Sequence, residues 1–254
     1  MMIDGVWVAV AGEPEQQPIV LVHGTLDRSA GMLKLSRRLD AAFHVVRYDR
    51  RGYGRSAEHP GPFDAPGNID DLVAVIEATS DRPAVIMGHS YGGNVALGVA
   101  DRRPDLVAAV AVYEMPQSWQ PWWSGGTAGG EALRARDDPA DAAERFMRRL
   151  VGDARWERLP PGTRDARRAE GRAVVGEMAD LRERAPWSPE RIAVPVLVMH
   201  GEHGQPHHRD GSRRLVALLD HAELHVVAGA RHFGPNTHPD AVASLIVDFL
   251  ARRG

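Results

Sequence analysis

The chain has 254 residues, of which 43% are hydrophobic and 26% charged; its formal net charge is −3, and it contains no cysteine. This size and composition indicate one globular domain, or one domain with an insertion, and exclude disorder as a global description. The charge excludes a basic field for nucleic acid or an anionic membrane, and the missing cysteines exclude disulfides, thiolate catalysis and cysteine-ligated zinc.

The start of the chain shows no basic segment followed by an apolar run, so we expect no secretory signal. No apolar stretch approaches the roughly 18 residues that a membrane-spanning helix needs. We therefore expect a soluble, cytoplasmic protein.

Short apolar runs with the composition of β-strands alternate with helix-like segments. The runs are residues 19–22, 45–48, 84–87, 107–113, 194–199 and 224–227. Runs of this kind suit strands buried on both faces, and their alternation with helices predicts a parallel sheet in an α/β fold. Near the N-terminus, Val6, Val8 and Val10 alternate with other residues and predict an antiparallel edge strand. The helix-like segments include residues 31–39, 94–102 and 239–252.

One long segment contains no convincing strand. We interpret residues 115–190 as a helical cap inserted into a core formed by residues 1–114 and 191–254. Its arginines alternate with acidic residues, which would cancel their field, so we interpret them as solvated helix faces rather than an anion or nucleic-acid site. The cap tryptophans are expected either to form an apolar wall over a substrate or to serve in cap–core packing. They include Trp119, Trp122 and Trp123.

A G-x-S-x-G pattern at residues 88–92 places Ser90 between a strand-like run and a helix-like run. This is the context of a nucleophile elbow, a sharp turn that needs the small residues Gly88 and Gly92 and presents the serine hydroxyl at a helix N-terminus. The alternative is a glycine-rich turn that holds an incidental serine. We expect Ser90 to be a nucleophile.

A nucleophilic serine in acyl transfer needs donors for the oxyanion. His23, Gly24 and Thr25 follow the strand-like run 19–22, where an open loop can aim a backbone N–H at the serine. We predict the N–H groups of Thr25 and Tyr91 as the two donors. A plain turn after the strand is the alternative.

Twelve histidines compete for the role of general base. His232 lies in a loop after the run 224–227 and before the last helix, so in a parallel sheet it reaches the same edge as Ser90. His225 within its strand and His238 at the start of the last helix are interpreted as structural.

The acid that orients the base must also lie at this edge. Glu114 ends the run 107–113, and Glu202 and Asp210 follow the run 194–199, so all three remain candidates.

The whole chain resembles the α/β-hydrolase superfamily, particularly the capped group that contains small esterases, haloalkane dehalogenases and cofactor-free haloperoxidases. The resemblance rests on His23–Gly24, on residues 48–56 and 88–93, and on the loop of His232. It implies a mostly parallel eight-stranded sheet flanked by helices, an inserted helical cap and no cofactor. Most relatives carry the acid at the position of Gly204, where glycine cannot serve. Some members carry a Glu just after the strand that precedes the cap, which favours Glu114.

A group of histidines suggests a metal site. It consists of His200, His203, His207, His208 and the carboxylate of Asp210. Imidazoles and a carboxylate suit zinc. We interpret the group instead as an exposed, partly protonated loop after a strand, and predict no metal.

These residues predict a carboxylesterase-like serine hydrolase that cleaves a small carboxylic ester, lactone or thioester through an acyl-enzyme. The serine excludes a dehalogenase or epoxide hydrolase of this fold, which needs a carboxylate nucleophile. A cofactor-free haloperoxidase or perhydrolase remains an alternative, and so does a non-catalytic ligand-binding protein, because Gly204 replaces the usual acid. The expected partner is a small-molecule substrate, with no nucleic acid or membrane, and the expected assembly is a monomer or homodimer.

Overall fold

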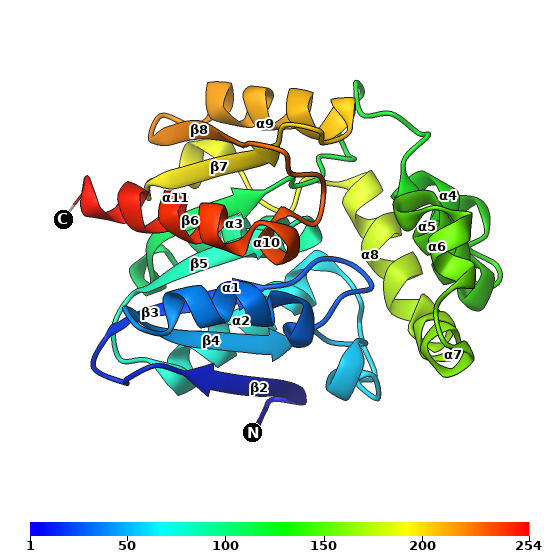
Figure 1. Ribbon diagram of the computed structural model, residues 1–254, viewed down its shortest axis with the longest axis horizontal. Coiled ribbons are helices and arrows are strands. Elements are labelled where there is room, and N and C mark those ends of the chain that lie inside the picture. Colours follow the sequence, from blue (N-terminus) through cyan, green and yellow to red (C-terminus); the bar gives the residue numbers. More distant parts are fainter. Residues whose placement is uncertain (254) are drawn as a thin grey trace.

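The computed structural model describes residues 1–253 and contains one eight-stranded sheet in the order β1-β2-β4-β3-β5-β6-β7-β8 (Figure 1). Strands β3 to β8 run parallel, whereas β1 and β2 are antiparallel to their neighbours. The strands are β1 (Met2–Ile3), β2 (Val6–Ala11), β3 (Gln17–Val22), β4 (Phe43–Asp49), β5 (Ala84–His89), β6 (Val107–Tyr113), β7 (Val196–Gly201) and β8 (Ala222–Val227). This is an α/β-hydrolase fold, as the sequence predicted.

Helices cover both faces of the sheet. Helices α1 (Leu33–Leu39) and α11 (Pro239–Ala251) pack on one face, with Leu35 and Ile246 buried in the same apolar cluster. Helices α2 (Ala65–Thr79), α3 (Tyr91–Arg102) and α9 (Pro206–Leu218) contribute to the apolar cluster on the other face. Because both faces are covered, β3, β5 and β7 are apolar along most of their length, as the unalternating runs predicted.

Two expectations about the sheet edges were wrong. Strand β2 is antiparallel but is not the edge strand, because the two-residue β1 pairs outside it, with Met2 opposite Trp7. Strand β8 is not buried on both faces. It lies at the opposite edge of the sheet, where most of its side chains are half-buried and Val226 is 52% exposed.

A block of helices without any strand lies between β6 and β7, at the right of Figure 1. Its members are α4 (Ala128–Arg134), α5 (Pro139–Val151), α6 (Asp153–Glu157), α7 (Pro161–Ala169) and α8 (Gly171–Glu183). These inserted helices occupy the position predicted for the cap. The short helix α10 (Gly234–Thr237) follows β8 and precedes α11. Within residues 1–253, no helix is long and apolar enough to span a bilayer.

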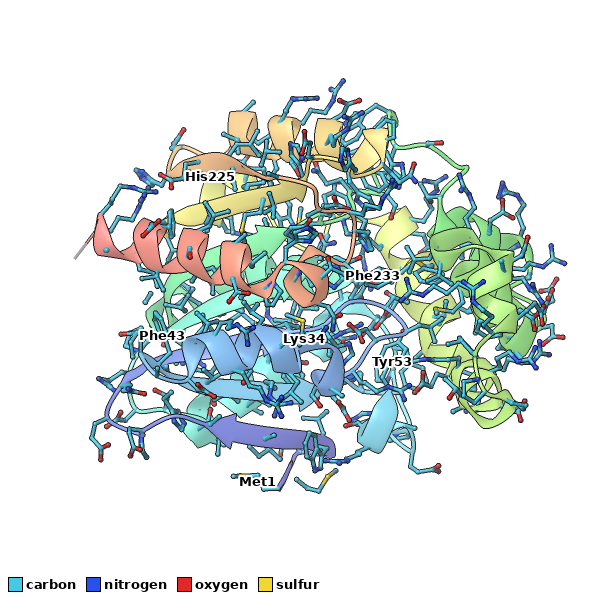
Figure 2. All side chains as sticks on the ribbon, viewed as in Figure 1. Met1, Lys34, Phe43, Tyr53, His225 and Phe233 are labelled. Carbon is cyan, nitrogen blue, oxygen red and sulfur yellow. The ribbon has the colours of Figure 1, made fainter. Side chains whose placement is uncertain are left out.

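The strand directions determine where the site can form. Parallel strands end at one edge of the sheet, and loops at that edge gather residues that are distant in sequence. Thr25, Ser90, Glu114 and His232 all follow the carboxyl ends of parallel strands, namely β3, β5, β6 and β8. In Figure 2 the labelled Tyr53 and Phe233 lie on the side of the sheet nearer the inserted helices, and Phe43, at the start of β4, lies at the opposite side.

Candidate active site

A cavity of about 340 Å³ lies between the carboxyl edge of the sheet and the inserted helices. This volume is at the lower end of the range usual for small-molecule sites. Ser90, His232, Thr25 and Tyr91 all line it. The structure therefore brings together the predicted nucleophile, the predicted base and the two residues predicted to supply oxyanion donors.

Ser90 occupies a strained turn between β5 and α3. Its backbone has φ 52° and ψ −123°, a conformation that L-residues rarely adopt, and its N–H donates to the carbonyl of Tyr113 at 2.8 Å. The turn is tight, because a Cβ on Gly88 would lie 2.4 Å from the carbonyl oxygen of Gly92, and one on Gly92 would lie 2.3 Å from that of Val22. Both glycines are thus required sterically. Ser90 caps the N-terminus of α3, whose partial positive charge favours an anion there.

Glu114 is the carboxylate that meets His232. Its Oε2 lies 2.8 Å from Nδ1 of His232, and its Oε1 accepts the N–H of Gly201 at 3.0 Å. Glu114 has no exposed surface and a positive φ of 47°, and its own N–H donates to the carbonyl of Met199. Both carboxylate oxygens are therefore hydrogen-bonded, as a buried carboxylate requires.

Gly204 makes room for this carboxylate. A Cβ at position 204 would lie 2.2 Å from Oε1 of Glu114. The two other candidate acids are elsewhere, because Glu202 accepts the N–H of Gly229 on the surface and Asp210 pairs with Arg213. Among the three candidates, only Glu114 contacts the imidazole in this structure.

Thr25 is held by a buried charge network that joins the core to the inserted helices. Its hydroxyl donates to Oε2 of Glu177 at 2.7 Å, and the Tyr53 hydroxyl donates to the same oxygen at 2.9 Å. Glu177, on α8, also forms an ion pair with Arg50, and neither side chain has exposed surface. Arg50 in turn donates from Nε to the carbonyl of His23 at 2.9 Å. Burial alone would lower the pKa of Arg50, but the Glu177 carboxylate beside it raises the pKa above its ordinary value.

Sequence reasoning missed Glu177. A signal was present, because the acid lies among the apolar positions Val174, Met178 and Leu181 of an otherwise amphipathic helix. Glu, when fully buried, almost always has a charged partner. An acid on the apolar face of a helix is therefore worth selecting as a candidate for a buried ion pair.

The histidine group is only in part the exposed loop that the sequence suggested, because His203 alone of its members lies exposed in the turn after β7. His200 is buried within β7, and His207 and His208 lie in the first turn of α9, a helix that sequence analysis missed. The rings of His208 and His232 stack, with centroids 4.7 Å apart and an interplanar angle of 22°. Burial, followed by the nearby His232, lowers the pKa of His207 to about 4 and lowers that of His208 well below its ordinary value. The imidazoles of His207 and His208 are thus neutral near pH 7.

One set of donors has the spacing of a possible metal site. Glu114, His208 and His232 each offer an atom, and the three atoms lie within 4.8 Å of one another. Two of these residues already share the 2.8 Å hydrogen bond between Nδ1 and Oε2. A metal held by these three residues would compete for the groups that the predicted triad uses.

The three cap tryptophans do not form one wall. Trp123 lines the cavity, whereas Trp119 packs edge-on against Trp187 at 5.7 Å between ring centroids. Trp122 lies under the guanidinium of Arg214, outside the lining. Trp123 therefore remains the one predicted substrate-binding tryptophan, because the side chains of Trp119 and Trp122 are used in packing.

Comparisons with known proteins identify the family of this chain. Residues 19–245 match the alpha/beta hydrolase family, and the chain belongs to that family. It is 26% identical to the 2-hydroxymuconate semialdehyde hydrolase of Pseudomonas sp. (strain CF600), covering 92% of this chain and 87% of that protein. It is 24% identical to the 2-(acetamidomethylene)succinate hydrolase of Mesorhizobium japonicum, covering 92% and 88%. The crystal structure of the enol-lactonase from Burkholderia xenovorans LB400 has the same fold, with a TM-score of 0.76, 24% identity and 98% of each chain covered.

The substitution Glu177→Gln should destabilise the protein by about 3–5 kcal/mol, because it leaves the buried Arg50 charge without its counter-ion. Urea unfolding monitored by circular dichroism measures this difference. The matched control is Glu77→Gln, which breaks the exposed pair with Arg103 and should cost at most about 1 kcal/mol. Equal costs for the two substitutions would contradict the assigned importance of the buried pair.

Buried neutral histidines predict acid sensitivity. His208 has a lowered pKa in the folded state because of burial, whereas an unfolded histidine has a pKa of about 6.5. The unfolded state then binds more protons below that pH, so this stabilisation is complete above about pH 6.5 and is lost as the pH falls. The expected slope is about 1.4 kcal/mol per pH unit for each such histidine.

Urea unfolding between pH 7 and pH 5 tests this prediction. His208→Gln should reduce the slope of the unfolding free energy against pH by the equivalent of about one bound proton, which is about 1.4 kcal/mol per pH unit. The matched control is His221→Gln, which replaces an exposed imidazole and should leave this slope unchanged. Parallel stability curves for wild type and His208→Gln would show that this imidazole does not resist protonation in the native state.

Proposed function

We propose that this member of the alpha/beta hydrolase family is a serine hydrolase that cleaves a small carboxylic ester, lactone or thioester through an acyl-enzyme. The observation that carries the proposal is the 2.8 Å hydrogen bond between Nδ1 of His232 and the fully buried Glu114, at the wall of the cavity that also contains Ser90. A carboxylate in that position fixes the imidazole with its Nε2 available to a serine hydroxyl.

In the proposed reaction His232 takes the proton of Ser90 as the serine oxygen attacks the substrate carbonyl carbon. The backbone N–H groups of Thr25 and Tyr91 stabilise the resulting oxyanion. His232 then gives its proton to the departing alcohol or thiol, and Ser90 keeps the acyl group. Water attacks the acyl-enzyme with His232 again as base, which releases the acid and restores the serine hydroxyl.

The position of His89 supports this assignment of the base. Its Nε2 lies 2.8 Å from the carbonyl oxygen of His232, so the residue before the nucleophile anchors the loop that carries the base. Burial, followed by the nearby His232, lowers the pKa of His89 to about 3, which keeps this ring neutral. A neutral neighbour adds no repulsion to the imidazolium that forms on His232 during the reaction.

The alternative of a non-catalytic ligand-binding protein depended on Gly204 in place of the usual acid. Glu114, directly after β6, provides His232 with a carboxylate instead, and this contact supports an intact triad. The two similar hydrolases are named for two different substrates, so the proposal for this chain names the bond class only.

Wild-type protein should react with a fluorophosphonate probe and hydrolyse 4-nitrophenyl esters, and Ser90→Ala should do neither. Mass spectrometry of the labelled peptide tests the position directly, because the cavity lining contains one further serine, Ser118, within the described residues. Labelling at Ser118, or equal ester hydrolysis by Ser90→Ala, would sink the assignment of the nucleophile.

Glu114→Gln should lower kcat by about 10⁴-fold, because a neutral amide neither holds the imidazole in the required tautomer nor stabilises its charged form. Steady-state kinetics with a 4-nitrophenyl ester measures the loss. Glu202→Gln is the matched control, since Glu202 contacts Gly229 and not His232. A larger loss from Glu202→Gln than from Glu114→Gln would show that the acid is misassigned.

A further inference from the structure

Four arginines line the cavity that contains the candidate active site. They are Arg149 at the end of α5, Arg155 on α6, Arg182 at the end of α8 and Arg231 in the loop after β8. All four are exposed to solvent and so form a rim rather than a buried cluster. Within the described part of the chain, the cavity lining contains no Asp or Glu.

None of these four guanidiniums forms an ion pair with an acid among residues 1–253, although most of their neighbours do. Arg145 pairs with Asp141, one turn from Arg149 on the same helix. Arg184 pairs with Asp180, two residues from Arg182. The interleaved acids therefore neutralise the outer faces of the inserted helices, as the sequence suggested, but they do not neutralise the face that lines the cavity.

Two of the rim arginines are held by neutral partners. Nε of Arg149 donates to the carbonyl of Gly126 at 3.0 Å, and Nη1 of Arg182 donates to the carbonyl of Ser118 at 3.0 Å. Carbonyl oxygens orient a guanidinium without cancelling its charge. Each arginine keeps further N–H donors for a ligand, since a guanidinium carries five.

The cavity also has an apolar part. Trp123, Leu133, Phe146 and Met178 line the same cavity, so a ligand that fills it places a hydrocarbon portion against these side chains. His207 lines the same cavity, and Arg149 is one of the groups that lower its pKa, although burial and then His232 contribute more. A cleft lined by charges of one sign concentrates ligands of the opposite sign.

Building on the proposed function, we infer that the substrate carries a carboxylate at the end remote from the scissile carbonyl, which the rim arginines bind. A guanidinium matches a carboxylate with two parallel N–H···O bonds, and this geometry makes arginine suited to the role. Water and salt screen these exposed charges, so each arginine contributes only a modest share. We therefore expect the preference for an anionic substrate to arise from the four arginines acting together.

The test uses two substrates of equal size that differ in charge, the mono-4-nitrophenyl ester of adipic acid and its terminal carboxamide analogue. Wild-type protein should give a ratio of kcat/KM, anionic over neutral, of about 10 or more at low salt. The ratio should fall as sodium chloride is raised from 0.05 to 0.5 M, because exposed charges are screened. A ratio at or below one, with both esters hydrolysed, would overturn the inference and leave the hydrolase intact.

Variants identify the residues involved. Arg149→Gln should lower the ratio by about 2- to 5-fold, and the combined change with Arg182→Gln should lower it further. The matched control is Arg145→Gln, on the same helix but outside the cavity lining, which should keep the wild-type ratio. An equal loss of ratio in Arg145→Gln would overturn the inference, because it would show only a general effect of net charge.

Binding measured without turnover distinguishes a failure of the inference from a failure of the proposed function. Ser90→Ala titrated calorimetrically with the same two esters should bind the anionic one more tightly, and Arg149→Gln in that background should reduce the difference. The anionic ester could bind more tightly while the wild-type protein hydrolyses neither ester faster than Ser90→Ala does. That result would refute the proposed ester hydrolysis, and the inference about its substrate would fall with it. Hydrolysis with equal binding of the two esters would refute the carboxylate alone.

Discussion

A guanidinium and a carboxylate without exposed surface, Arg50 and Glu177, join the core of this protein to its inserted helices. Removing either charge leaves the other buried without a counter-ion, so the core and the inserted helices are energetically coupled. The same carboxylate accepts the hydroxyl of Thr25, whose backbone N–H is the proposed oxyanion donor. Movement of α8 away from the core would break both contacts at once. One buried ion pair therefore positions both α8, which lines the cavity, and the loop that carries Thr25.

The position of the acid in the proposed triad is linked to the glycine at position 204. Glu114 fills the space that a side chain at position 204 would need, since a Cβ there would approach its carboxylate to 2.2 Å. An acid can thus come from the residue that follows β6 or from the loop after β7, but the two positions cannot both carry one. The glycine that raised doubt about catalysis is the residue that permits the alternative acid.

Local sequence patterns predicted most of the sheet, because the burial of a strand and the sterics of a glycine turn are determined by residues that are close together in the sequence. The Ser90 turn is an example, as its strain, its glycines and the following helix all lie within one short segment. The partner of Arg50 could not be predicted in this way, because Glu177 is 127 residues distant and its burial depends on the docking of α8. The helix α9 was missed because its polar first turn, with His207 and His208, resembles a loop.

The arginines of the cavity show why the net charge of a chain, and the alternation of acids and bases along it, do not predict the charge of a site. The chain has a formal charge of −3, and its inserted helices carry acids between their arginines, yet folding directs the acids outward or into pairs. Each guanidinium of the rim comes from a different element, so no single segment contains the pattern. An uncompensated charge at a site is a property of the tertiary fold, because only the fold decides which charges remain without a neighbour of opposite sign.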